Sequence, residues 1–136
     1  MMDVKTHTIC YSCRDTKYSF GTGFILNKKI KYLPMDFQAV SPRLCYLSLR
    51  GKFNNHSIIN VHALTEENED AEKDRFYEEL DHLWERCPSH DVQIIMGDFN
   101  AKMGKEEEFC AVIGRNSLHN ISNENGNRIL SFACIP

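Results

Sequence analysis

The most regular pattern along the chain is a helical stripe in its middle. Apolar side chains recur there at i, i+1, i+4, i+7 and i+8: Phe76, Tyr77, Leu80, Leu83 and Trp84. This spacing forms one face of an amphipathic helix. Acidic residues crowd the first turns, where they suit the helix dipole, and Pro88 follows the last turn. The pattern predicts a helix over residues 69–86, with the acidic run as its solvated outer face.

Short apolar or alternating runs before this helix predict β-strands. The candidate strands are residues 6–11, 21–26, 43–50 and 57–62. A turn-rich stretch through Asp15 follows the first of them. Residues 51–55 contain Gly-Lys and Asn-Asn pairs, which predict a hairpin between the last two strands. The apolar run 58–61 favours a central place in the sheet for the final strand.

Two further elements are predicted after the helix. Residues 92–96 form a short apolar run between Asp91 and Gly97, which is typical of a buried strand that ends at the glycine. Asn125-Gly126 marks a turn or the start of another helix. The order of strands and helices predicts an α/β fold with a mixed sheet covered by helices, and one domain spanning residues 1–136.

Composition narrows the class of protein. The chain is 42% hydrophobic and 26% charged, as in globular rather than disordered proteins. It has no apolar stretch of about 18 residues and no secretory signal, so we expect an intracellular protein with no membrane partner. Its six cysteines are expected to be reduced thiols, since the Cys10-x-x-Cys13 pair lacks a second pair that would complete a zinc site.

Charge is unevenly distributed along the chain. The formal net charge is -3, but residues 66–81 hold nine of the 19 acidic groups and two of the 16 basic ones. The rest of the chain is therefore mildly basic, and the lysines at 28, 29 and 31 mark a solvated loop or strand edge. A mildly basic body with one acidic helix is compatible with a phosphate-bearing substrate.

Residues that could take part in catalysis lie at the end of the predicted strand 92–96. Asp98 and Asn100 are separated by one residue, so alternation points both to one side, with Phe99 toward the core. A carboxylate there can activate a water, and a carboxamide can donate a hydrogen bond to a phosphate oxygen without adding negative charge. The alternative is a plain turn, in which both side chains satisfy backbone groups.

A second polar pair ends the preceding strand. Asn60 and His62 show the same i, i+2 placement. A histidine there can donate a hydrogen bond to a phosphate or shuttle a proton. The alternative is a capping or solvent-facing histidine with no chemical role.

Four segments resemble one enzyme superfamily. Residues 94–101, Ile-Ile-Met-Gly-Asp-Phe-Asn-Ala, resemble the Gly-Asp-Phe-Asn motif of the endonuclease/exonuclease/phosphatase superfamily, which includes DNase-I-like enzymes and retrotransposon endonucleases. Residues 21–26 resemble its glycine-rich strand, and residues 59–65 its Asn-Val-Tyr/His-Ala-Pro-Thr strand end. Residues 123–133 resemble a segment of RTE-type retrotransposon endonucleases and of the craniofacial-development-protein-like sequences related to them.

The resemblance implies a fold and residue roles. The fold would be part of the four-layer α-β-β-α sandwich of DNase-I-like proteins, without its N- and C-terminal strands. The catalytic residues would be Asp98, which orients or activates the attacking water, Asn100, which stabilises the phosphate, and His62, which contacts it. Asn60 and Asn100 would line the substrate, with Asn60 supporting the strand end. The implied cofactor is Mg²⁺ and the implied partner is DNA.

Two departures from the superfamily pattern limit what the resemblance implies. Leu64 stands where the superfamily usually has proline. The superfamily's metal-binding asparagine and glutamate, and its closing Asp-His pair, have no match, so we predict no metal ligand in this chain. Mg²⁺ needs carboxylates to bind against its own hydration.

These observations leave several functions open. The first is a fragment of a Mg²⁺-dependent endonuclease that is weakly active or inactive alone. The second is a non-catalytic, transposon-derived remnant that acts as an interaction or chromatin-associated protein, for which the resemblance implies nuclear residence. A truncated gene product without function is a third, and a phosphatase acting on a small phosphorylated substrate is a fourth.

Overall fold

The computed structural model describes residues 1–13 and 21–135, so the end of the predicted turn through Asp15 lies outside the described residues. The chain divides into two compact units. Unit 1 comprises residues 1–62 and 83–97, and unit 2 comprises residues 63–82 and the chain from residue 98 onward. No helix of the described chain is long and apolar enough to cross a membrane.

The first sheet of unit 1 has three antiparallel strands in the order β1-β2-β3. They are β1 (Met2–Asp3), β2 (His7–Cys13) and β3 (Gly21–Asn27). A short 3-10 helix, η1 (Lys28–Ile30), follows β3, and the Asn27 side chain caps it by accepting a hydrogen bond from the backbone N–H of Lys29 at 2.9 Å. The strands predicted over residues 6–11 and 21–26 are confirmed.

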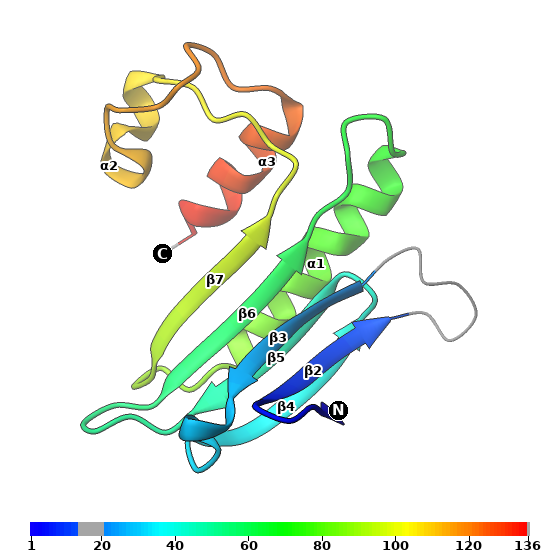
Figure 1. Cartoon of the computed structure of the whole chain (residues 1–136). Helices are drawn as coiled ribbons and strands as arrows, with labels where there is room; N and C mark the ends of the chain where they lie inside the picture. The colour runs from blue at the N-terminus through cyan, green and yellow to red at the C-terminus, as the bar shows by residue number, and fades with distance from the viewer. Residues whose placement is uncertain (14–20, 136) are drawn as a thin grey trace. The chain divides into compact units, whose positions relative to one another are not determined.

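The second sheet has four strands in the order β4-β5-β6-β7. They are β4 (Pro34–Ser41), β5 (Leu44–Leu49), β6 (His56–His62) and β7 (Val92–Asp98). β4, β5 and β6 are antiparallel neighbours, whereas β6 and β7 run in the same direction (Figure 1). The predicted hairpin and the central place of β6 are confirmed. β4 was not predicted, because two register shifts break its alternation.

The two sheets pack against each other in unit 1 (Figure 1). Cys10 of β2 and Cys45 of β5 are fully buried, and Leu47 lies with Cys10 along the lining of a cavity of about 410 Å³. Burial raises the pKa of the Cys45 thiol to about 11. All six cysteines are free, and the Cys10/Cys13 pair lies on one strand, buried and exposed respectively. The pair therefore consists of strand thiols.

The prediction of a buried strand at residues 92–96 is wrong. Val92, Ile94 and Met96 are exposed by 45%, 39% and 49%. The reason is the position of β7 at the edge of its sheet, where one face carries these three side chains into solvent. The strand also continues through Gly97 to Asp98 instead of ending at the glycine.

The long helix α1 (Asp70–Arg86) confirms the helix predicted over residues 69–86. Its apolar stripe is buried at Phe76, Leu80 and Leu83. Unit 2 contains residues 70–82 of this helix, together with η2 (Glu107–Phe109), α2 (Cys110–Ile113) and α3 (Glu124–Ala133). Asn123 caps α3, since its Oδ1 accepts a hydrogen bond from the backbone N–H of Gly126 at 2.8 Å. The described part of the chain, with its two sheets and three α-helices, is α/β, as predicted.

Candidate functional site

Gly97 lets β7 approach β6 closely at the end of the sheet. Its φ is +132°, a conformation that favours glycine. A Cβ atom at this position would overlap the carbonyl oxygen of Val61 and lie 2.8 Å from Oδ1 of Asn60. The glycine of the Gly-Asp-Phe-Asn segment is therefore required by the packing of unit 1, independently of any chemistry.

Asn60 uses its side chain within unit 1. Its Nδ2 donates a hydrogen bond to the carbonyl oxygen of Gly23 at 2.6 Å, which links β6 to the first sheet. His62 lies two residues further along the same face of β6, and both side chains are half-buried. Arg43 donates from Nη1 to the carbonyl oxygen of His62 at 3.1 Å. The structure thus gives Asn60 a bridging contact and leaves the predicted role of His62 as a prediction.

Asp98 and Asn100 form a turn in unit 2. Oδ1 of Asp98 accepts a hydrogen bond from the backbone N–H of Asn100 at 2.8 Å, and the Asp98 side chain is exposed. Asn100 has a φ of +46°, a left-handed conformation that asparagine tolerates better than most residues. Nδ2 of Asn100 donates to the carbonyl oxygen of Ala63 at 2.8 Å, and Ala63 N–H donates to the carbonyl oxygen of Asp98 at 2.8 Å. The turn is therefore held at both ends.

Asn125 supports this turn, whereas its sequence pattern predicted only a turn or the start of a helix. Its side chain is buried, and Nδ2 donates to the carbonyl oxygens of Leu64 and Asn100, both at 2.9 Å. Its backbone N–H donates to Oε1 of Glu66 at 2.7 Å. The Asn-x-Asn-Gly spacing at the start of α3 was the signal available in the sequence, because the first asparagine caps the helix and the second then points inward.

The loop that follows β6 is anchored without the proline of the superfamily pattern. Leu64 is 8% exposed, and its carbonyl oxygen accepts from Asn125. The buried Lys73 donates from Nζ to the carbonyl oxygen of Glu66 at 2.9 Å. Leucine in this place therefore contributes burial, while the polar contacts of Asn125 and Lys73 fix the backbone.

The acidic first turns of α1 are partly neutralised within unit 2. Arg128 of α3 is paired with Asp74, and its Nη2 lies 3.3 Å from Asp70 and 3.4 Å from Glu124. The hydrogen bond to Asp74 is the main reason that the pKa of Arg128 is raised. Nζ of Lys73 lies 4.0 Å from both Asp70 and Glu124. The acidic face of the helix is solvated, as predicted, but two of its carboxylates, Asp70 and Asp74, belong to an ion-pair network.

The polar groups at the turn do not make a complete magnesium site. Within residues 1–13 and 21–135, no three His, Cys, Asp or Glu side chains gather where they could hold a metal ion. Asp98 supplies one carboxylate to the turn, and one of its oxygens already accepts the Asn100 N–H. Mg²⁺ requires near-octahedral oxygen ligands, usually with further carboxylates. The donors of the turn therefore do not fit the ion by themselves.

Comparison with known proteins identifies relatives of the chain. No protein-family model matches the chain. Over 126 residues, or 93% of the chain, the sequence is 35% identical to craniofacial development protein 2 of Bos taurus. The chain is homologous to a segment of that protein. Craniofacial development protein 2 of Tragulus javanicus is 36% identical over 126 residues. The matches cover 21% and 22% of these relatives, so the chain spans about a fifth of their length.

The homology confirms the predicted resemblance to craniofacial-development-protein-like sequences. The name craniofacial development protein 2 refers to development and specifies no chemical reaction. The roles of Asp98, Asn100, His62 and Asn60 in catalysis or substrate binding therefore stay predictions.

Proposed function

We propose that the chain is part of an endonuclease-type phosphodiesterase domain with the four-layer arrangement of DNase-I-like enzymes, and that it is weakly active or inactive by itself. The proposed substrate is DNA and the proposed cofactor is Mg²⁺. The observation that carries this proposal is the Asp98–Asn100 turn, where an exposed carboxylate ends strand β7 and a fixed carboxamide follows it. Functional groups are commonly presented on such loops by a rigid scaffold.

The side chains of the turn suit two tasks in phosphodiester hydrolysis. Asp98 is exposed and uses one oxygen for the Asn100 N–H, so a water can still donate a hydrogen bond to its carboxylate. The side-chain amide nitrogen of asparagine carries two hydrogens, and Asn100 donates one of them to the carbonyl oxygen of Ala63. The second hydrogen can bond a phosphate oxygen without adding negative charge.

We expect low catalytic activity from this chain, because it has too few groups to stabilise the negative charge of the transition state. The turn offers one carboxylate, which cannot anchor Mg²⁺ alone. Losing a single donor to a transition-state oxyanion costs on the order of a hundredfold or more in rate. We therefore propose that the remaining groups come from elsewhere in the protein.

Dimethyl phosphate, a phosphodiester without bases, tests the proposed phosphate contact. The backbone amide signals of residues 98–101 are expected to shift in a saturable way when the compound is titrated into the labelled chain in a nuclear magnetic resonance experiment. Asn100→Asp is expected to abolish this shift, because it replaces the N–H donor with a negative acceptor while tolerating the same φ.

Asn120→Asp is the matched control, because it adds the same charge to an exposed asparagine of unit 2 and should leave the shift unchanged. A titration that moves no signal in residues 98–101, or that moves them equally in Asn100→Asp, contradicts the proposed role of Asn100.

A second candidate is a non-catalytic remnant that acts as an interaction or chromatin-associated protein in the nucleus. The internal hydrogen bonds of Asp98 and Asn100 favour it, because both side chains already shape the backbone of the turn. A thermal unfolding experiment with added MgCl₂ tests this second candidate. Saturable stabilisation that disappears in Asp98→Ala contradicts the remnant, since only a specific site stabilises the folded state in this way.

A further inference from the structure

Three turns at one end of unit 1 form a surface of a single charge sign. They are residues 4–6, 28–33 and 50–55. Together they carry six lysine or arginine residues and no aspartate or glutamate: Lys5, Lys28, Lys29, Lys31, Arg50 and Lys52. We call these three turns the basic–aromatic surface. Such a concentration of one sign creates a field that attracts polyanions.

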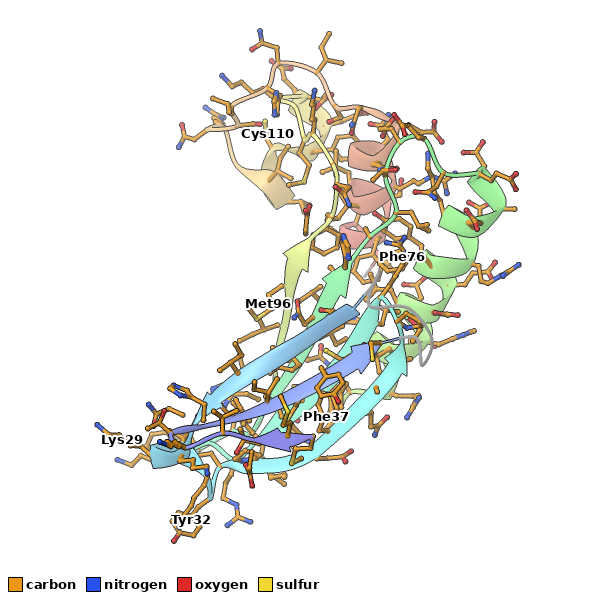
Figure 2. The ribbon with its side chains drawn as sticks, turned by 45° about the vertical axis from the view of Figure 1, so that its right-hand side comes forward. Lys29, Tyr32, Phe37, Phe76, Met96 and Cys110 are labelled. Carbon is orange, nitrogen blue, oxygen red and sulfur yellow. The ribbon has the colours of Figure 1, made fainter. Side chains whose placement is uncertain are left out.

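Backbone hydrogen bonds hold the three turns together. The N–H of Lys28 donates to the carbonyl oxygen of Thr6 at 2.9 Å, and the N–H of Arg50 donates to the carbonyl oxygen of Leu33 at 2.7 Å. The basic side chains therefore start from adjoining backbone. Lys29 and Tyr32 can be seen projecting from this end of unit 1 in Figure 2.

Two aromatic rings stand among these charges. Tyr32 is 76% exposed and Phe53 is 88% exposed. Nζ of Lys31 lies 4.8 Å from the Tyr32 ring centroid, and Nζ of Lys52 lies 5.2 Å from the Phe53 ring centroid. Each ring thus forms a pair with the lysine before it, and its exposed surface remains available to a partner.

Three acidic side chains that follow or precede these strands and turns have polar neighbours. Asp3 accepts a hydrogen bond from the Thr8 hydroxyl at 2.6 Å, and Asp36 accepts from Gln38 at 2.8 Å. The Asp91 side chain is buried, and it accepts from the Ser57 hydroxyl at 2.8 Å. These carboxylates border the surface but do not lie within its three turns.

We propose that the basic–aromatic surface binds single-stranded nucleic acid. The lysines and Arg50 would neutralise phosphates, and Tyr32 and Phe53 would stack on unpaired bases. In a duplex the bases are stacked on one another, so exposed rings of this kind suit a single strand better. An anionic membrane is disfavoured, because Phe53 is flanked by Lys52 and Asn54, which would lose hydration if the hairpin tip entered hydrocarbon.

None of the residues of this surface belongs to the residues of the proposed function. It includes the hairpin before β6, whereas His62 ends that strand. Binding requires neither Mg²⁺ nor Asp98, so it can be measured in EDTA. A failure of binding in EDTA would leave the proposed chemistry of Asp98 and Asn100 unaffected.

The test is fluorescence anisotropy with labelled oligo-dT of about 15 nucleotides, within the range that single-strand binding modules occupy. The chain is expected to bind it, and Tyr32→Ala/Phe53→Ala should weaken binding about tenfold or more, as stacking is lost. Lys31→Ala/Lys52→Ala should also weaken it, and should reduce the slope of log K against log salt by about 1.4 for two lost phosphate contacts. All four side chains are exposed, so the variants should keep the fold, which circular dichroism checks.

Lys105→Ala/Arg115→Ala is the matched control, because it removes the same charge from exposed positions of unit 2 and should leave binding unchanged. The proposal is overturned if the chain does not bind oligo-dT, or if the control weakens binding as much as Lys31→Ala/Lys52→Ala. It is also overturned if Tyr32→Ala/Phe53→Ala has no effect on oligo-dT binding, or if phosphatidylserine vesicles are bound more tightly than oligo-dT through the same two rings.

Discussion

Replacing Gly97 with alanine is expected to destabilise the chain by about 3 kcal/mol or more. The new Cβ would overlap the Val61 carbonyl oxygen, which belongs to the backbone of the neighbouring strand β6 and cannot rotate away. The φ of +132° adds strain for any residue with a side chain. Equilibrium unfolding in urea measures the loss.

Gly114→Ala separates the clash from the backbone strain. Gly114 also has a positive φ, +72°, but a Cβ there would meet nothing within 4 Å. We expect this control to cost about 1–2 kcal/mol, from conformational strain alone. Equal losses for Gly97→Ala and Gly114→Ala would contradict the account of close packing between β6 and β7.

Asn125→Leu is expected to cost about 2–4 kcal/mol, because it removes one donor that serves two carbonyl oxygens. The carbonyl oxygens of Leu64 and Asn100 would then lose their hydrogen bonds to Asn125. Asn125 is only 2% exposed in the native protein, so the loss would occur at a buried position. The substitution should also loosen the Asp98–Asn100 turn. Urea unfolding measures the stability, and hydrogen exchange at the Asn100 amide measures the loosening.

Asn127→Leu provides the comparison for that variant. Asn127 lies in the same helix α3 but is exposed, so we expect a change within about 0.5 kcal/mol. If Asn125→Leu were as mild as Asn127→Leu, the buried amide would not be what holds the turn.

Secondary structure that depends on residues close together in the chain was predictable from the sequence. The helix α1 was predicted within one residue at its start, since its apolar stripe has the helical period and Pro88 lies just beyond its end. The strand β4 was missed because its two register shifts interrupt the alternation on which a strand prediction depends. The exposure of β7 was also not predicted, because the burial of a strand depends on its position in the sheet, which the sequence pattern does not specify.

Within the candidate site, the sequence predicted the polar residues of the turn but not their support. Asp98 and Asn100 were chosen by their i, i+2 spacing after an apolar run. Asn125 was missed, since its two carbonyl partners at Leu64 and Asn100 are distant in sequence and only tertiary structure brings them to its amide. A local pattern cannot specify such a contact.

The Gly-Asp-Phe-Asn segment can form a structural turn and still offer groups for catalysis, because the two roles depend on different atoms of the same side chains. Gly97 serves packing, and one oxygen of Asp98 serves the turn. The exposed remainder of the Asp98 carboxylate and the second amide hydrogen of Asn100 stay available for a water and a phosphate. A turn that is fixed internally is better suited to hold such groups in a defined geometry.

A plasmid-nicking assay with Mg²⁺ tests most directly the claim that this turn is a positioned but incomplete catalytic site. The chain is expected to nick supercoiled DNA at a weak or background rate, and Asp98→Ala should abolish any nicking above background. Glu78→Ala, an exposed carboxylate lost from α1, should change nothing. Robust nicking that disappears in Asp98→Ala would contradict the claim, because the chain would then hold a complete site.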